Sequence, residues 1–435
     1  MRSLMARRTH RWLALAVLLM ATVLPAGGAS AAADERQVRE NIFIDEAKDF
    51  NPANGVRSGT GTRRDPYVIS NWDVNWIEIK DTAAHVLIAD NTVDNLVLDW
   101  IGPGVAVRNN TVGDLRVNQN RPRKGEATSG VIENNKFEVV GQLRHFDGFF
   151  QNNIVGSKDQ MFDLPFDGRA VNFDGFNGSV FRNNTIYGYM DARLHGHHHS
   201  SGFTEGSHYH GDAKEMDHAT MDHSIRYHQV HIYGNKIYSD YYYALQYVDT
   251  AHSANDRTAA SETEESLNAP HIHYTRVFLH DNQMIGSGIA VNVFNAKDER
   301  HKSTARGLVE ISNNKISVAQ PSDLTEFGGR SGIDVAQAVD VTMRIFDNTI
   351  VGPQPADAVS GLREDWEPTI GINLWDLDKG DIYLSDNAIS HAAFGVKAAR
   401  FTKTVNWTIS ELSTSDVDET VYWDSSVENP PRQNP

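Results

Sequence analysis

The first regular feature of the chain is a short pattern of apolar and polar positions that recurs along its length. It is clearest at residues 86–93, VLIADNTV, and returns at residues 105–112, VAVRNNTV, and 309–316, VEISNNKI. Two apolar residues separated by one other are followed by two polar residues, an Asn, any residue and an apolar residue. Alternation with a period of two is typical of a β-strand that buries one face. The pattern therefore predicts a strand, a corner and the start of the next strand.

An asparagine occupies the same place in every copy of this pattern. Ten copies share one register, and their asparagines are Asn91, Asn110, Asn135, Asn153, Asn184, Asn235, Asn282, Asn314, Asn348 and Asn387. Asparagine tolerates the left-handed backbone of a tight bend, and its side chain can hydrogen-bond an asparagine stacked on it. The first four are 19, 25 and 18 residues apart, about the length of one coil of a three-sided β-helix. We expect them to mark the corners of stacked coils.

The repeat predicts an all-β protein, a right-handed parallel β-helix (a solenoid) with long loop insertions, over residues 34–424. A set of unrelated turns in a β-sandwich is the alternative, and ten copies in one register argue against it. Residues 34–50 are expected to cap the first coil, since the end strands of a solenoid need covering. The later asparagines are 31 to 51 residues apart, so the extra residues should leave the coils as loops. Residues 425–435 are expected to be a disordered tail.

The first 33 residues have the pattern of a signal peptide. Four arginines, Arg2, Arg7, Arg8 and Arg11, precede an apolar run from Trp12 to Leu24, which is too short to span a bilayer. Small residues follow at positions 29–33, as at a signal peptidase site. We predict export, by the Sec or the twin-arginine route, of a periplasmic or secreted protein with no membrane anchor.

Charge and cysteine content limit the partners of the chain. The formal net charge is −17, and without the four arginines of the signal it would be about −21. Such a surface repels nucleic acid and anionic membranes, which favours cations as partners and predicts no nucleic-acid binding. The chain has no cysteine, so disulfides and thiolate metal sites are excluded. A capped solenoid needs no partner to complete its core, which predicts a monomer.

Residues 59–69, GTGTRRDPYVI, together with the Asn-Asn-Thr-Ile type of repeat, resemble a known group of exported β-helix proteins. The family that the sequence resembles is the NosD-like periplasmic copper-binding β-helix family, over roughly residues 55–400. The resemblance implies a periplasmic β-helix that handles copper. The wider class of right-handed β-helices also contains polysaccharide lyases and glycosidases.

The longest interval, between Asn184 and Asn235, is rich in histidine and contains two Met-Asp-His units. Neutral imidazole is the commonest metal ligand, thioether sulfur suits Cu(I), and imidazole with carboxylate suits Cu(II) or Zn(II). The segment at about 190–228 therefore predicts a loop that binds a transition metal, with copper favoured and zinc as the alternative, and that exchanges it with a periplasmic metalloprotein. A solvated spacer that binds metals adventitiously is the other interpretation. The candidate ligands are His195, His197, His198, His199, His208, His210, Met216, His218, Met221 and His223.

Further histidines flank this loop. His231 and Tyr233 alternate with Val230 and Ile232, which predicts that the first two face outward from a strand. Alignment of Asn282 with Asn235 places His280 over Tyr233 on the next coil. Two more histidines precede that strand at alternating positions, after an acidic insertion (His271, His273; Glu262, Glu264, Glu265). Together they predict a rigid metal or substrate site, with ordinary exposed polar residues as the alternative.

A polysaccharide lyase or glycoside hydrolase acting on the β-helix wall is the alternative function, and a structural or adhesive β-helix is the third interpretation. The tyrosine-rich residues 238–247, near Arg226, Tyr227 and His231, would supply sugar platforms and a base, although tyrosine also favours strands for packing alone. A glycosidase needs two carboxylates about 5 to 10 Å apart. Candidates for these are Asp163, Asp167, Asp174 and Asp191, and the sequence does not pair them.

Overall fold

The computed structural model describes residues 36–102, 104–119, 130–144, 146, 148–160, 169–174, 179–195, 228–239, 243–250, 275–294, 307–319, 331–336, 338–353, 369–428 and 432–433. These residues form 31 strands and three short 3-10 helices, η1 (Ala47–Asp49), η2 (Pro52–Asn54) and η3 (Lys158–Gln160). No helix in this part of the chain has the length and apolar character needed to cross a membrane.

Every pairing between named strands is parallel, and the pairings form two sheets, A and B. Sheet B contains β2 (Tyr67–Ser70), β4 (Val86–Ala89), β6 (Val105–Arg108), β8 (Gly130–Glu133), β10 (Gly148–Gln151), β13 (Val180–Arg182), β16 (His228–Tyr233), β19 (Thr275–His280), β22 (Gly307–Ser312), β25 (Val339–Phe346), β29 (Val405–Ser410) and β31 (Arg432–Gln433). One long strand, β27 (Ile370–Ser385), takes part in both sheets.

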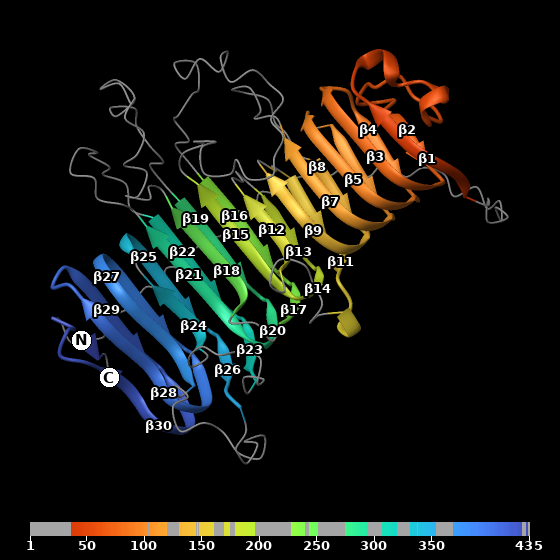
Figure 1. Ribbon diagram of the computed structural model, residues 1–435. Coiled ribbons are helices and arrows are strands. Elements are labelled where there is room, and N and C mark those ends of the chain that lie inside the picture. Colours follow the sequence, from red (N-terminus) through yellow and green to blue (C-terminus); the bar gives the residue numbers. More distant parts are fainter. Residues whose placement is uncertain are drawn as a thin grey trace, which may run out of the picture. The chain divides into compact units, whose positions relative to one another are not determined.

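Sheet A contains the remaining strands, which in the middle coils come as two segments each. They are β1 (Gln37–Ile44), β3 (Trp72–Thr82), β5 (Thr92–Ile101), β7 (Thr111–Gln119), β9 (Lys136–Arg144), β11 (Ile154–Val155), β12 (Arg169–Asp174), β14 (Thr185–Tyr187), β15 (Tyr189–His195), β17 (Lys236–Tyr238), β18 (Tyr243–Thr250), β20 (Gln283–Gly286), β21 (Gly288–Phe294), β23 (Lys315–Val318), β24 (Ser331–Ala336), β26 (Thr349–Val351), β28 (Ala388–Phe401) and β30 (Ser413–Trp423). Figure 1 shows the strands stacked side by side, from the red end near β1 to the blue end near β30. The predicted right-handed parallel β-helix is confirmed.

The alternating pattern buries one side of each strand in a single core. Val86 and Ile88 are fully buried, whereas Leu87 between them is partly exposed on the outer face. The core is one cluster that runs from Ile42 near the first coil to Val427 near the last. Each coil buries its apolar face only against its neighbours, so the stacking itself stabilises the fold.

The ten repeat asparagines form a continuous buried ladder, as expected. From Asn91 to Asn387, the side-chain nitrogen of each asparagine donates to the side-chain oxygen of the asparagine on the next coil, at 2.8 to 3.2 Å. The prediction was wrong in one respect, because the left-handed residue is the one before each ladder asparagine: Asp90, Asn109, Asn134, Asn152, Asn183, Gly234, Asp281, Asn313, Asp347 and Asp386. Two adjacent residues therefore have separate roles. The first adopts the left-handed conformation of the bend, and the asparagine after it forms the buried hydrogen bonds of the ladder.

Both ends of the solenoid are closed by a described strand that pairs with its neighbour. At the first coil β1 pairs with β3, and the capping role predicted for residues 34–50 stays a prediction. At the last coil the structure describes residues 425–428 and 432–433 of the predicted disordered tail, and disorder of the tail as a whole stays a prediction. Val427 is buried against the core, and β31 pairs with β29 in sheet B.

Candidate functional site

Three insertions, whose own residues lie outside the described ranges, begin at the same corner on successive coils. Residues 196–227, 251–274 and 295–306 each join the end of a sheet-A strand to the start of a sheet-B strand. The strand ends that precede them, His195, Thr250 and Phe294, are register partners in sheet A. The strand starts that follow the first two, His228 and Thr275, are partners in sheet B. Parallel strands lie about 4.8 Å apart, so the chain enters and leaves these insertions at closely spaced, fixed points.

The predicted metal ligands lie almost entirely outside the described residues. The backbone of His195 is described, as the last residue of β15. The other nine are His197, His198, His199, His208, His210, Met216, His218, Met221 and His223, and all lie outside the described ranges. Among the residues that the structure does describe, no group of three or more His, Asp or Glu side chains is arranged to hold a metal ion. Metal binding by the loop therefore stays a prediction.

The histidines of the neighbouring wall are placed as predicted. Val230 and Ile232 are fully buried, and His231 and Tyr233 face outward. The ring of His280 stacks on that of Tyr233 with the centroids 4.8 Å apart and the planes within 5°. The ring of His231 stacks in the same way on Phe278, at 4.6 Å and 9°. His271 and His273 lie outside the described residues.

His280 is held by a carboxylate. Its Nδ1 lies 2.7 Å from Oδ2 of Asp281, and the side chain of Asn313 donates to the other oxygen of that carboxylate. These two hydrogen bonds, the one to His280 first, lower the pKa of Asp281. In a neutral imidazole that donates from one nitrogen to a carboxylate, the other nitrogen is an acceptor, which is the usual arrangement behind a metal-bound imidazole.

His231 favours its neutral form. Burial is the main cause that lowers the pKa of His231, and the neighbouring charge of His280 lowers it further. The side-chain nitrogen of Gln229 contacts Nε2 of the same ring. A neutral imidazole is the form that binds metals and accepts hydrogen bonds, so this side chain is ready for either role at neutral pH.

A half-buried carboxyl on the outer face of sheet A could not be recognised from the sequence. Oδ2 of Asp334 accepts a 2.6 Å hydrogen bond from the Tyr243 hydroxyl, and Oδ1 accepts one of 2.9 Å from Asn373. Burial raises the pKa of Asp334, and burial together with this carboxylate raises that of Tyr243. A raised pKa favours the protonated carboxyl, which is the form that can donate a proton.

A glycosidase would need a second carboxyl near Asp334. Asp191, the predicted candidate whose side chain the structure describes, does not lie there. Asp191 is fully buried and forms an ion pair with Arg169 at 3.1 Å. The register Asp191, Gln246, Ala290, Asp334 places the two carboxyls three strands apart, about 14 Å, beyond the separation that glycosidases use. The side chains of Asp163, Asp167 and Asp174, and residues Arg226 and Tyr227, lie outside the description.

The tyrosines of residues 238–247 have separate environments. Tyr247 is fully buried, so it is unable to serve as an exposed sugar platform. Tyr238 is partly exposed and stacks on Tyr187, with the centroids 4.9 Å apart. Tyr243 is the partner of Asp334 described above. The described tyrosines therefore do not form one exposed platform.

Comparisons with known protein families, with curated proteins and with solved structures give no match for this chain. The parallel β-helix architecture is shown by the strand pairings themselves. Function has to be argued from the chemistry at particular positions.

Proposed function

We propose that this protein is an exported β-helix that binds a transition metal ion, copper in preference to zinc, at the corner where residues 196–227, 251–274 and 295–306 leave the solenoid. The observation that carries the proposal is the strand register at this corner. His195, Thr250 and Phe294 end three adjacent strands of sheet A, so the three insertions start side by side.

The content of these insertions supports the proposal. Seven histidines lie in residues 196–227, three in 251–274 and one in 295–306. Two methionines, Met216 and Met221, accompany them in the first insertion. A set of imidazole and thioether ligands fits copper in both of its oxidation states, whereas zinc prefers imidazole and carboxylate. Fixed strand ends reduce the ordering that a metal must impose on its ligands.

The resemblance to the NosD-like periplasmic copper-binding β-helix family points in the same direction. It rests on residues 59–69 and on the asparagine repeat, which are features of the fold. Under this proposal the protein works in the periplasm or the medium as a monomer, and it passes its metal to, or receives it from, a periplasmic metalloprotein.

The experiment is a titration of the untagged, exported protein with Cu(II), Cu(I) and Zn(II). A variant without residues 197–223 is compared with a control variant without residues 320–330, an insertion between β23 and β24 that contains no histidine. We expect stoichiometric, tight binding of copper that disappears in the first variant and persists in the second. Binding that is weak and unchanged by the first deletion would contradict the proposal.

A further inference from the structure

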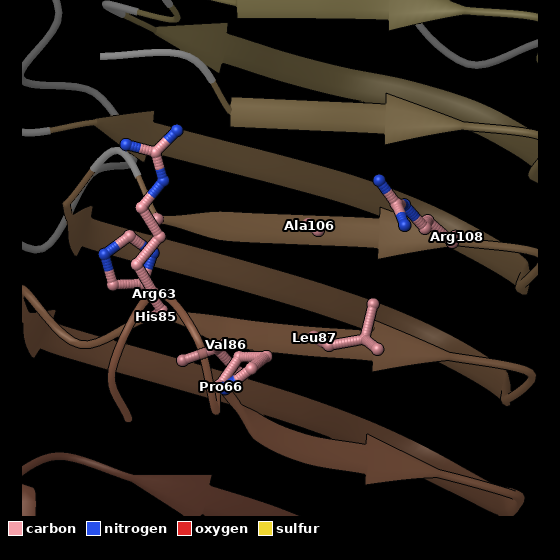
Figure 2. Close-up of a pocket in the computed structure, with 8 residues that line it drawn as sticks. Arg63, Pro66, His85, Val86, Leu87, Ala106 and Arg108 are labelled. Carbon is pink, nitrogen blue, oxygen red and sulfur yellow. The ribbon is translucent and has the colours of Figure 1, made fainter. Parts of the chain in front are cut away.

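An open hollow of about 190 Å³ lies on the outer face of sheet B, between the turn before β2 and the first residues of β4 and β6. Figure 2 shows Arg63 and His85 at one end of this hollow and Arg108 at the other, with Leu87 and Ala106 between them. None of its residues lies in the three insertions proposed to bind metal. We call it the N-terminal hollow.

The floor of the N-terminal hollow is apolar. Leu87 and Ala106 are register partners on β4 and β6, and both are partly exposed on the outer face. Pro66, the residue before β2, adds a third apolar side chain. These side chains carry no hydrogen-bonding atoms, so the floor favours contact with a flat apolar group over contact with a hydrated inorganic ion.

The ring of His85 forms a fixed wall beside this floor. The backbone N–H of His85 donates to the carbonyl of Gly61 at 2.9 Å, and the carbonyl of His85 accepts from the backbone N–H of Tyr67 at 2.9 Å. A β-carbon at Gly104 would overlap Nδ1 of the His85 ring, so the absence of a side chain there leaves the ring its place. A planar ring held in this way offers a stacking surface to another ring.

Arg63 supplies an unpaired positive charge at the same end of the hollow. It lies in a turn closed by two backbone hydrogen bonds of 3.1 Å between Thr62 and Asp65. Within the described part of the chain, Arg63 has no ion pair and no side-chain hydrogen bond. At the other end Arg108 is paired with Glu133 at 2.9 Å. The described residues that line the hollow include no Asp or Glu, so Arg63 is available to a carboxylate, which a guanidinium binds through paired hydrogen bonds.

The surroundings of the hollow are basic, although the whole chain has a net charge of −17. Residues 57–64 contain three arginines and no acid. Residues 120–129, which lie outside the described ranges, contain two arginines and a lysine against one glutamate, and they lead into β8, the strand paired with β6. Charges more than about 8 Å away are largely screened at physiological ionic strength. The acidic parts of the chain therefore leave Arg63 accessible to a small molecule with one negative charge.

We propose that the N-terminal hollow binds a small aromatic carboxylate, with its ring on the apolar floor beside His85 and its carboxylate on Arg63. A cavity of about 150 Å³ is enough to hold one benzene ring, so this hollow has room for a single ring with one carboxylate. Inorganic phosphate or sulfate would leave the apolar floor unused. The proposal goes beyond the proposed metal binding and is independent of it.

The test compares benzoate with benzamide, which has the same ring without the charge. Binding to the full exported protein is measured by ligand-observed NMR titration with EDTA present, so that bound metal does not hold the carboxylate. We expect benzoate to bind about tenfold to a hundredfold more tightly than benzamide, and Arg63→Gln to weaken benzoate binding by a similar factor. Arg64→Gln is the matched control, because Arg64 is exposed in the same turn and does not line the hollow.

A second variant tests the floor without changing the charge. Ala106→Leu fills the space between β4 and the end of the hollow and should weaken benzoate binding about tenfold or more. Equal binding of benzoate and benzamide, or binding of neither, would overturn the inference, and this comparison uses the unaltered protein. Equal losses in Arg63→Gln and Arg64→Gln, or displacement of benzoate by an equal concentration of inorganic phosphate, would also overturn it, because either result indicates general attraction of anions.

Discussion

The side-chain nitrogen of Asn184 donates a hydrogen bond of 2.8 Å to the side-chain oxygen of Asn235, across 51 residues of sequence. The same oxygen accepts the backbone N–H of Asn184 at 3.0 Å. Between these two asparagines lies the histidine-rich insertion. The ladder therefore continues past the insertion, and the coils on either side of it stay stacked.

Replacing a ladder asparagine should be costly. In Asn235→Ala, two buried donors of Asn184 lose their acceptor, and the carbonyl of Phe181 loses the donor that bonds it at 3.1 Å. Unpaired buried polar groups cost on the order of 1 to 3 kcal/mol each. We expect the free energy of unfolding, measured by denaturant titration, to fall by about 3 kcal/mol.

The control for this prediction is Asn406→Ala. The amide of Asn406 is exposed and donates to Asp381 at 3.1 Å on the surface. Its loss should change the free energy of unfolding by less than about 0.5 kcal/mol. Equal losses in the two variants would show that the ladder contributes no more than a surface hydrogen bond.

A second prediction concerns the left-handed residue before each ladder asparagine. Asp347 has a φ of 55°, in the left-handed region that disfavours β-branched side chains. We expect Asp347→Val to be less stable than Asp347→Gly by about 1 to 2 kcal/mol, as measured by thermal or denaturant unfolding. If valine were tolerated as well as glycine, the bend would not depend on the left-handed conformation.

The repeat predicted the fold because both of its parts have local causes. The alternation of Val86 and Ile88 with Leu87 follows from the two-residue period of a strand, and the structure buries the first two. The stacking of His280 on Tyr233 followed from aligning Asn282 with Asn235. The assignment of the left-handed bend was wrong by one residue, since asparagine fits that conformation and in several copies, such as Asn109 and Asn110, occupies both positions.

The ion pair of Arg169 and Asp191 should stabilise the middle of sheet A. Asp191 is fully buried and Arg169 is mostly buried. Removing Arg169 takes a cationic partner from a buried carboxylate, so Arg169→Met should lower the free energy of unfolding by about 3 kcal/mol. The double variant Arg169→Met/Asp191→Leu should recover much of this loss, because two apolar residues replace the pair. A double variant as unstable as the single one would contradict this explanation.

The raised pKa of Asp334 predicts that the free energy of unfolding depends on pH. Burial raises its pKa in the folded protein, so the folded state binds this proton more tightly than the unfolded state does. The resulting stabilisation is complete below the unfolded pKa of about 3.9 and is lost as the pH rises through the folded pKa.

Asp334→Asn lacks this dependence and serves as the comparison. The stability of the wild type relative to the variant should therefore decrease as the pH is raised from about 3 to about 7. Free energies of unfolding of both proteins over this range test the prediction. Parallel curves would show that the carboxyl does not titrate abnormally.

Contacts between side chains of different coils outside the repeat could not be predicted from the sequence. Tyr243 and Asp334 are 91 residues apart, and insertions between them hide the register that brings them together. Arg182 meets Tyr233 across the same 51 residues that contain the histidines. The repeat predicts which repeat residues are register partners on neighbouring coils. Which other side chains meet on the outer faces of the sheets is known only once the strands of every coil are aligned.

The most direct test of the central claim is a Cu(II) titration of the wild type beside the double variant His271→Gln/His273→Gln. These histidines belong to the second insertion, so they contribute only if the insertions share one site. We expect the affinity to fall by about tenfold or more, since losing a ligand costs at least as much as losing a group that supports one. His85→Gln, at the connection between β3 and β4, is the control and should leave the affinity unchanged. An unchanged affinity in the double variant would contradict a shared site, and absence of binding in the wild type would contradict metal binding altogether.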